Sequence, residues 1–400
     1  MCGIGLRCGL RCQVWRSMHI LTLSAPVTIR THRTPQILEP GSYLVEDRNA
    51  WEIAFMAEPG MVEINRWGPR LVEGSLIASG GDWSGKSILL IRPGGLGALM
   101  LLGCVVREIK RRWPTCAVAL SCSPGGEEVF EGVTEGKPDA FVPYPLPMSL
   151  LAGYDAVIPM EGATEYSPGA HDAHMVDVFA KRVGIEMPAD MAAREPAFAT
   201  SDEERREALR RYPRTARPRL ALQFGGSCGV RTYPADLMLQ VVYFLVEKRG
   251  WEVMLLGNPG ELDFGERVRF PGQVKNCSMD GLSFRESAGV VATSDVVLAP
   301  DSVWTHVAGA LSMPAVALYG SESWLQRTAQ YPKTAALTSG KCPLAPCHHW
   351  PKNMMDFPAN GPCARTGCCV EMAWIGGESK VKAGEPGPGR ICAAVERCRP

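Results

Sequence analysis

The sequence lacks several features that would place it quickly in a functional class. Its 42 Lys and Arg residues are balanced by 42 Asp and Glu residues, so no net positive charge attracts nucleic acid or an anionic membrane. It has no run of roughly 18 uncharged apolar residues, and the arginines near its start precede only a short apolar stretch, His19 to Ala25. We therefore expect a cytoplasmic protein with no transmembrane segment, no secretory signal and no nucleic-acid partner.

The chain also lacks the complete G-x-G-x-x-G fingerprint of dinucleotide-binding proteins. Such a site further requires an acidic residue for the ribose about 20 residues beyond the first glycines. The segment from Thr115 to Ser123 contains none. An oxidoreductase that uses a nicotinamide cofactor is therefore disfavoured, although it would share the outline of two α/β lobes.

Cysteine, in contrast, is abundant: the chain has 15, and seven of them fall between Cys342 and Cys398. A chain without an export signal keeps its thiols reduced, so clustered cysteines favour a metal over disulfides. A structural zinc or iron ion in the tail would be held by four thiolates: Cys342, Cys347, Cys363 and Cys368. A loosely ordered tail is the alternative. Five other cysteines lie among apolar or glycine-rich neighbours and are expected to be small buried side chains: Cys104, Cys116, Cys122, Cys228 and Cys277.

Hydrophobic patterning divides the 400 residues into four parts, as expected for a chain longer than one core usually organises. Residues 1–85 hold a leader and a small β-rich module, 86–198 and 199–335 each alternate strands with helices, and 336–400 form a Cys-rich tail. Short alternating runs predict four strands in the β-rich module: 27–30, 43–46, 51–55 and 61–65.

The two central parts carry near-continuous apolar runs, each followed by a helical pattern, which predicts parallel sheets covered by helices. The first such unit is a strand at 87–92 followed by a helix at 98–113. The charged stretch 201–219 is expected to be a solvated connector in which Ser201 caps a short helix. The predicted fold class is α/β, with two Rossmann-like domains that face a central cleft.

Two glycine-rich turns follow predicted strands. Gly94, Gly95 and Gly97 would let backbone N–H groups and a helix start approach an anion, or would merely allow tight packing of the helix. In the second domain, a loop suits a diphosphate, because its glycines and hydroxyl offer close donors and its arginine a charged fork: Gly225, Gly226, Ser227 and Arg231. The alternative for the arginine is a solvated side chain after an ordinary turn.

The segment from Ala299 to Gly320 is the most informative. It places four polar side chains between a buried strand and the first turn of a helix, where ligands bind in open α/β sheets: Asp301, Ser302, Thr305 and His306. Taken singly, Ser302 is also explained as a helix N-cap and His306 as a histidine satisfied on a helix face.

Three segments, in this order, resemble the heptosyltransferase-type family of GT-B glycosyltransferases, glycosyltransferase family 9: Ile88 to Leu102, Leu222 to Pro259 and Ser283 to Gly320. They match a glycine-rich first turn, a Gly/Ser loop with a basic residue before an aromatic–Pro pair, and an Asp-Ser/Thr loop with a histidine. The resemblance implies a nucleotide-sugar donor such as ADP-heptose on the second domain, a saccharide or protein acceptor on the first, and inverting, metal-independent transfer. It also implies a place in lipopolysaccharide biosynthesis.

Two positions depart from the family pattern. Ala98 stands where the family carries the aspartate that acts as base on the acceptor, and Val303 replaces a glycine. A transferase would then need another base, for which the first domain offers Glu161 and His171. The alternative is a catalytically silent protein that binds nucleotide sugars or assists assembly and has lost its base.

Overall fold

The computed structural model divides the chain into two compact units, Met1–Ala197 (unit 1) and Phe198–Pro400 (unit 2). It describes residues 18–31, 34–58, 61–66, 82–166, 170, 172–226, 231–233, 235–257, 270, 272–320, 322–338 and 387–399.

Unit 1 begins with antiparallel strands. β1 (Met18–Leu23) pairs with both β4 (Gly41–Glu46) and β5 (Val62–Arg66), while β2 (Val27–Thr31) pairs with β3 (Thr34–Leu38). Beyond these, β4 pairs with the short strand β9 (Leu146–Pro147). Because β9 comes from the part of unit 1 that follows residue 86, the first sheet includes a strand from the following α/β part of the chain. One hydrophobic core accordingly contains Met18 and Leu44 together with Leu89 and Ile91.

Residues 51–55 were expected to form a strand, and that prediction is wrong, because they belong to the helix α2 (Asp47–Met56). Ala50 and Ile53 lie three residues apart and are both buried, which is the spacing of a helix face. The hydroxyl of Tyr144 accepts a hydrogen bond from the N–H of Glu46 and donates one to Oδ1 of Asn49, both at 2.9 Å. A side chain about a hundred positions away therefore helps to hold the first turn of α2.

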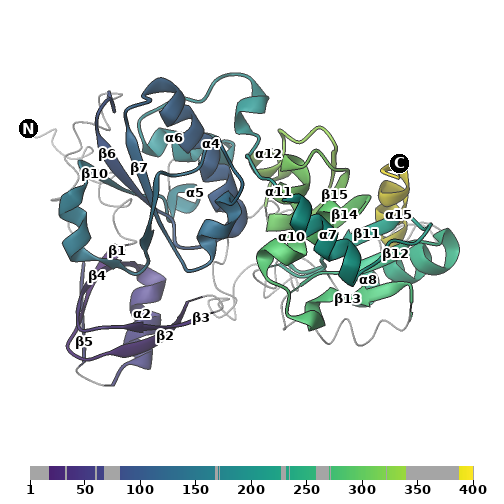
Figure 1. Ribbon diagram of the computed structural model, residues 1–400, viewed down its shortest axis with the longest axis horizontal. Coiled ribbons are helices and arrows are strands. Elements are labelled where there is room, and N and C mark those ends of the chain that lie inside the picture. The colour runs from purple at the N-terminus through teal and green to yellow at the C-terminus, as the bar shows by residue number, and fades with distance from the viewer. Residues whose placement is uncertain are drawn as a thin grey trace, which may run out of the picture. The chain divides into compact units, whose positions relative to one another are not determined.

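The α/β part of unit 1 is a parallel sheet with the strand order β10-β6-β7-β8. In chain order the fourth strand lies beside the first, so the winding of the sheet reverses between β6 and β10, which makes this a topological switch point. Figure 1 shows α4 and α6 lying side by side in this part. The bounds are β6 (Ser87–Ile91), α4 (Leu96–Arg112), β7 (Ala117–Cys122), β8 (Ala140–Pro143), β10 (Ala156–Pro159), α5 (Ala163–Tyr166) and α6 (Met175–Arg182).

The described residues of unit 2 form a sheet of six parallel strands in the order β13-β12-β11-β14-β15-β16. This is the 3-2-1-4-5-6 order of a Rossmann sheet, with its switch point between β11 and β14. The two parallel sheets confirm the predicted mixed α/β class. The strand bounds are β11 (Arg219–Leu222), β12 (Glu252–Leu255), β13 (Val274–Asn276), β14 (Val296–Pro300), β15 (Ala315–Tyr319) and β16 (Thr334–Thr338).

Helices connect these strands. The predicted helix over 234–249 is α8 (Ala235–Tyr243), which continues as a π-helical turn, Phe244–Lys248. The other helices in the part of unit 2 that the structure describes are α7 (Asp202–Arg211), α10 (Phe284–Ala292), α11 (Val303–Ala310), α12 (Trp324–Arg327) and α15 (Gly387–Arg397). Shorter 3₁₀ turns span Gly126–Phe130, Met148–Gly153, Met191–Arg194 and Cys277–Asp280.

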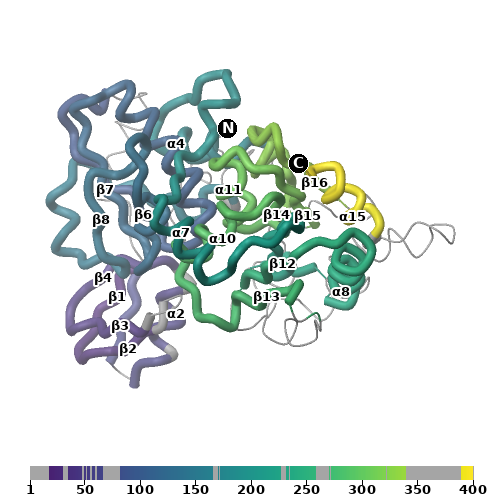
Figure 2. The backbone as a smooth tube through the Cα atoms, turned by 45° about the vertical axis from the view of Figure 1, so that its right-hand side comes forward, coloured from purple at the N-terminus to yellow at the C-terminus, as the bar shows by residue number. Residues whose placement is uncertain are grey.

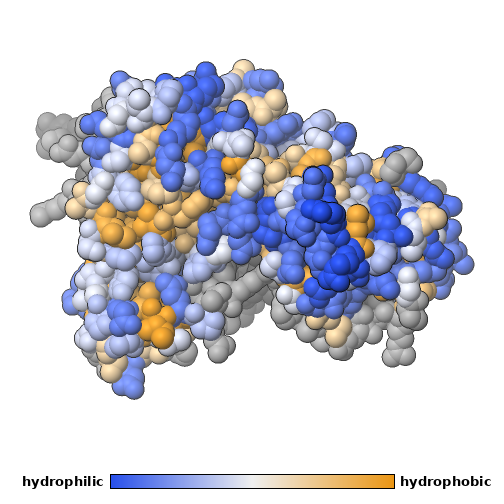
Figure 3. All heavy atoms as spheres, viewed as in Figure 1, coloured by the Kyte–Doolittle hydropathy of each residue, from blue (hydrophilic) through white to orange (hydrophobic). Residues whose placement is uncertain are grey.

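The charged segment at the start of unit 2 is more than a solvated connector. Ser201 caps α7 as predicted, and Glu204 completes a capping box. The helix also packs on α10, since a Cβ atom at Gly289 would lie 2.6 Å from the carbonyl oxygen of Glu204, and Arg285 pairs with Glu204 at 2.6 Å. Ala208 is the buried residue of α7, while most of its other residues are exposed and form hydrophilic surface (Figure 3). The charged residues of this segment indicate which side chains are exposed, but they give no sign of the contact between α7 and α10.

In its described residues, the end of the chain contains a strand and a helix. β16 adds an edge strand, and α15 lies beside α8 (Figure 2). The buried face of α15 belongs to the core of unit 2 through Ile391, Cys392 and Val395. The indole N–H of Trp251 donates to Oε1 of Glu396 at 2.5 Å. Burial of Cys104, Cys116, Cys122 and Cys277 is confirmed, whereas Cys228 lies outside the described residues.

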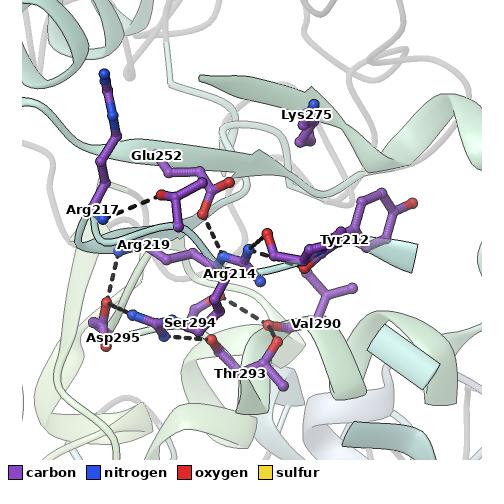
Figure 4. A network of polar contacts seen from close by, with 12 residues as sticks. Tyr212, Arg214, Arg217, Arg219, Glu252, Lys275, Val290, Thr293, Ser294 and Asp295 are labelled. Atoms are coloured by element: carbon purple, nitrogen blue, oxygen red, sulfur yellow. Dashed lines mark hydrogen bonds and ion pairs between the residues drawn. The ribbon is translucent and has the colours of Figure 1, made fainter. Parts of the chain in front are cut away.

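A polar network lies where the strands of unit 2 begin (Figure 4). Arg219, at the start of β11, is fully buried and pairs with Glu252 of β12 at 2.8 Å. Its Nη2 atom donates to the carbonyl oxygens of Tyr212 and Pro213 at 3.0 and 2.8 Å. Asp295 accepts from the N–H of Arg219 at 2.7 Å and from Arg214 at 2.6 Å. These short contacts hold the amino edge of the sheet together, although Nη1 of Arg219 has no hydrogen-bond partner within the described residues.

Candidate functional site

The opposite edge of the same sheet carries a second cluster of charges. Parallel strands end at a common edge, so the residues that follow β11, β14 and β15 meet there. Nη1 of Arg231 lies 3.5 Å from Oδ2 of Asp301, and its Nη2 lies 3.3 Å from Oε1 of Glu322. Arg327 pairs with Glu322 at 3.0 Å and reaches Oδ2 of Asp301 at 4.0 Å. We call Arg231, Asp301, Glu322 and Arg327 the unit 2 cluster.

The unit 2 cluster is buried but not internally satisfied. Asp301, Glu322 and Arg327 are 8%, 3% and 6% exposed. Within the described part of the chain, Oδ2 of Asp301 and Oγ of Ser302 are buried and have no hydrogen-bond partner. Buried polar atoms in folded proteins are nearly always hydrogen-bonded, so orphaned ones call for a reason, and a ligand is one. The cluster flanks the β11/β14 switch point, where open α/β sheets bind ligands.

A glycine explains the position of Arg231. A Cβ atom at Gly226 would stand 2.5 Å from Cβ of Arg231 and 3.0 Å from its carbonyl oxygen, so only glycine allows the loop to fold this closely. The N–H of Gly226 also donates to Oγ1 of Thr232 at 3.2 Å. Gly225 is buried beside it, and Ser227 lies outside the described residues. The structure therefore brings Arg231, from the glycine-rich loop, within 3.5 Å of Asp301, from the loop after β14.

Thr305 and His306, two of the other polar residues of the Asp301 segment, make hydrogen bonds within unit 2. Oγ1 of Thr305 donates to the carbonyl oxygen of Pro300 at 3.1 Å. Nδ1 of His306 lies 2.8 Å from the hydroxyl of Tyr331, and the aromatic ring of Tyr331 packs where a Cβ atom at Gly309 would stand. This arrangement fits the alternative reading of His306 as a histidine satisfied on its helix. Ser302 occupies the N-cap position of α11, but its side chain makes no capping hydrogen bond.

Sequence reasoning missed Glu322 and Arg327. Both follow β15 within a few residues, and that position was the available signal. Tyr319, the last residue of β15, is buried, and burial together with the negative charge of Asp301 raises its pKa well above the usual range. Its neutral hydroxyl donates to Oγ1 of Thr328 at 3.0 Å. The charge at this edge is therefore set by the two arginines and two carboxylates.

In unit 1, the predicted glycine-rich turn joins β6 to α4. Gly95 is exposed, has φ = 76° and occupies the N-cap position of α4, where no side chain makes a capping hydrogen bond. Gly94 is half-buried and Gly97 is buried in the first turn of the helix. A φ of this sign is easily adopted only by glycine. The turn thus leaves the backbone N–H groups at the start of α4 without a side-chain partner.

Glu161 follows β10, on the other side of the β6/β10 switch point. Nη1 of Arg92 donates to Oε2 of Glu161 at 2.6 Å and contacts the carbonyl oxygen of Met160 at 3.4 Å. Arg92 was not predicted, although it directly follows β6. Glu161 would have to disrupt this ion pair to accept a proton, which makes it a poorer base than an unpaired carboxylate.

Several predicted residues lie outside the described residues, namely His171 and the four cysteines proposed as metal ligands: Cys342, Cys347, Cys363 and Cys368. Among the residues that the structure does describe, no group of three or more His, Cys, Asp or Glu side chains is arranged to hold a metal ion. In the same described ranges, no helix is both long and apolar enough to cross a membrane.

Comparisons with known proteins find a matching family model and solved structures of similar fold. The model of glycosyltransferase family 9 (heptosyltransferase) matches residues 169–356. ADP-heptose LPS heptosyltransferase II of Escherichia coli is 16% identical in sequence, with a TM-score of 0.52 over 63% of this chain and 90% of that one. A glycosyl transferase family 9 protein of Veillonella parvula is 14% identical, with a TM-score of 0.50 over 64% and 86% of the two chains. At these identities the likeness shows the fold. No curated protein matches the chain.

Proposed function

Because the chain is a divergent, heptosyltransferase-like member of glycosyltransferase family 9, we propose that it transfers a sugar, heptose or a related one, from a nucleotide-diphosphate donor. The acceptor is a saccharide or a protein, and the anomeric configuration is inverted. The donor is held by unit 2 and the acceptor by unit 1.

The unit 2 cluster is the observation that carries this proposal. Arg231 is its most accessible member, with 21% of its side chain exposed, and its contacts to carboxylates are 3.3 and 3.5 Å long. These are looser than the 2.8 Å contact of the buried pair Arg219–Glu252. A diphosphate can therefore recruit the guanidinium of Arg231 as a bidentate partner at little cost. The orphaned Oγ of Ser302 would donate to the same ligand.

The reaction needs positive charge where the diphosphate leaves. An acceptor hydroxyl oxygen forms the new bond to the anomeric carbon while the bond from that carbon to the diphosphate oxygen breaks. Arg231 and the N-terminus of α11 would stabilise the charge that collects on the departing diphosphate. We expect no catalytic metal, since these groups supply the charge that a metal would provide. The hydroxyl proton passes to a base.

The residue that accepts the proton must differ from that of the family pattern. Ala98 cannot accept a proton, and Glu161 is engaged by Arg92 at 2.6 Å. Glu161, with 22% of its side chain exposed, is still the carboxylate at the unit 1 switch point and our candidate, with His171 as the second. General-base catalysis is typically worth about 10²–10⁴-fold. The same two observations favour a second candidate function, a nucleotide-sugar-binding protein without transferase activity.

Calorimetric titration of the full chain with ADP-heptose and other nucleotide sugars, with donor hydrolysis and transfer followed in the same samples, tests both functions. Arg231→Ala and Asp301→Ala should each weaken donor binding by about 10–100-fold, the range for charge-assisted hydrogen bonds. Arg249→Ala, at the exposed end of the helix that begins with α8, is the matched control and should bind normally.

The outcomes separate the two candidates. Turnover that falls about 100-fold in Glu161→Gln while donor affinity is kept would establish the transferase and its base. Donor binding without turnover for any saccharide or protein acceptor would establish the silent binding protein. If no nucleotide sugar binds, the assignment of the unit 2 cluster is wrong.

A further inference from the structure

We propose that the position of the missing base in unit 1 has become a binding site for an oxyanion, a phosphate or carboxylate group, formed by Arg92, Gly95 and the first turn of α4. The contacts that form this site do not depend on the proposed function. We further assign the bound oxyanion to the acceptor of the transfer reaction, and this assignment alone rests on the proposed function.

Arg92 is the core of this site. Its side chain is 8% exposed, and its guanidinium lies over the ring of Phe179 at 5.7 Å. Within the described residues, the side-chain hydrogen bonds of Arg92 all use Nη1, which donates to Glu161 and to the carbonyl oxygen of Met160. The Nε atom is buried and has no hydrogen-bond partner within the described residues. Glu161 thus orients the guanidinium from one side and leaves the Nε and Nη2 edge, the edge that grips an oxyanion with two parallel bonds.

That edge faces the start of α4. The Nη2 atom lies 3.8 Å from the place where a Cβ atom at Gly95 would stand. The same place is 3.5 Å from Cβ of Ala98, so the side chain at position 98 points toward the turn that Arg92 reaches. The helix has 17 residues, no acidic residue in its first turn and no side-chain cap. Backbone N–H groups and the positive end of its dipole therefore add to the guanidinium.

The residue at position 98 decides the charge of the site. An aspartate there would place a carboxylate between Arg92 and the start of α4 and would itself take the role of the anion. With Ala98 the positive groups remain and the competing charge is gone. Glu161 is the remaining acidic side chain in contact with Arg92 among the described residues. The alteration that removes a base thus creates affinity for an external anion.

Isothermal titration of the full chain with inorganic phosphate, and separately with acetate, tests the site. Arg231→Gln serves as background, because it removes the other anion site that we propose. In this background, phosphate or acetate should still bind, and Arg92→Gln should weaken the binding at least about tenfold, as expected for one charge-assisted contact. Tighter binding of phosphate than of acetate would indicate a phosphoryl group on the natural ligand, and the reverse a carboxylate.

Ala98→Asp is the second variant and keeps Arg92 in place. It should also weaken anion binding about tenfold, whereas Ala98→Ser, of similar size and uncharged, should stay within about twofold. Glu161→Gln should tighten binding, because it removes the competing charge. ADP titration of Arg92→Gln alone should be unchanged, which separates this site from the unit 2 cluster. Equal anion affinity in Ala98→Asp and Ala98→Ser, or in Arg92→Gln and its parent, would overturn the proposal.

Discussion

The two edges of the unit 2 sheet both hold arginines against carboxylates, but they do so in different ways. At the amino edge, Arg219 and Glu252 are 0% and 2% exposed by side chain and lie 2.8 Å apart, with further hydrogen bonds from Arg219 to backbone carbonyls. At the carboxyl edge, contacts of Arg231 are 3.3 and 3.5 Å long, and neighbouring polar atoms are orphaned. Orphaned atoms occur at both edges, since Nη1 of Arg219 also has no hydrogen-bond partner within the described residues. The edges differ in that Arg219 is fully buried in a short pair, whereas Arg231 is 21% exposed and has longer contacts, which suits an exchange of partners with a ligand.

The largest change in the free energy of unfolding is expected at the amino edge of the unit 2 sheet. Glu252→Gln leaves the charge of Arg219 buried without its counter-charge, and such changes cost about 3–5 kcal/mol of unfolding free energy. Urea denaturation of the full chain should show this loss, while Glu247→Gln, at an exposed position on the helix that follows α8, should change little. The double variant Arg219→Met with Glu252→Leu should recover most of the stability. A small loss in Glu252→Gln would contradict the structural role of the pair.

A smaller change is expected from Gly226→Ala at the carboxyl edge. The new methyl group would lie 2.5 Å from Cβ of Arg231, so Arg231 must move, and overpacking of this kind costs about 1–3 kcal/mol. We expect ADP affinity to fall about tenfold, measured by titration calorimetry. Gly153→Ala is the control, because nothing lies within 4 Å of its Cβ position. Unchanged ADP affinity would show that ADP binding does not depend on the position of Arg231.

Ser302→Ala separates stability from binding at the same edge. The hydroxyl is buried without a partner, so its removal should leave the free energy of unfolding unchanged or raise it by up to about 1 kcal/mol. Nucleotide-sugar affinity should fall severalfold, because the ligand loses a donor. Thermal unfolding and calorimetry on one preparation would measure both. A clear loss of stability would mean that Ser302 serves the fold instead of a ligand.

A pH-dependent effect is expected in the core of unit 2, to which Cys392 belongs. Burial raises the pKa of the Cys392 thiol to about 12, whereas an unfolded thiol ionises near about 8.5. The folded state therefore holds a proton that the unfolded state releases, and stability falls as pH rises from about 8.5 toward 12. The urea midpoint should drop more between pH 7.5 and about pH 10 in the wild type than in Cys392→Ala. Equal drops would contradict burial of the thiol.

Sequence periodicity predicted the strands and helices whose apolar residues repeat with the period of the element. Buried parallel strands such as β14 and β15 read as continuous apolar runs, and β6 lies within the predicted strand 87–92. The helix of residues 47–56 was missed because its first turn is held by Tyr144, far away in the chain. Likewise, the charges of 201–219 gave no sign that Arg219 is fully buried, since burial of a charge depends on its partner Glu252.

By itself, the sequence determined that the chain is α/β and where its Gly-rich and Asp-Ser loops stand, because strand and helix periods and turn residues are local properties. Only the tertiary structure decided which polar residues act together. Strand order, which depends on long-range pairing, brings Glu322 and Arg327 to Arg231 and Asp301, and places Arg92 between Glu161 and the turn beside Ala98. The spacing of residues in the sequence does not predict the contacts of Arg231 with Glu322 or of Arg92 with Glu161, since each joins residues that follow different strands.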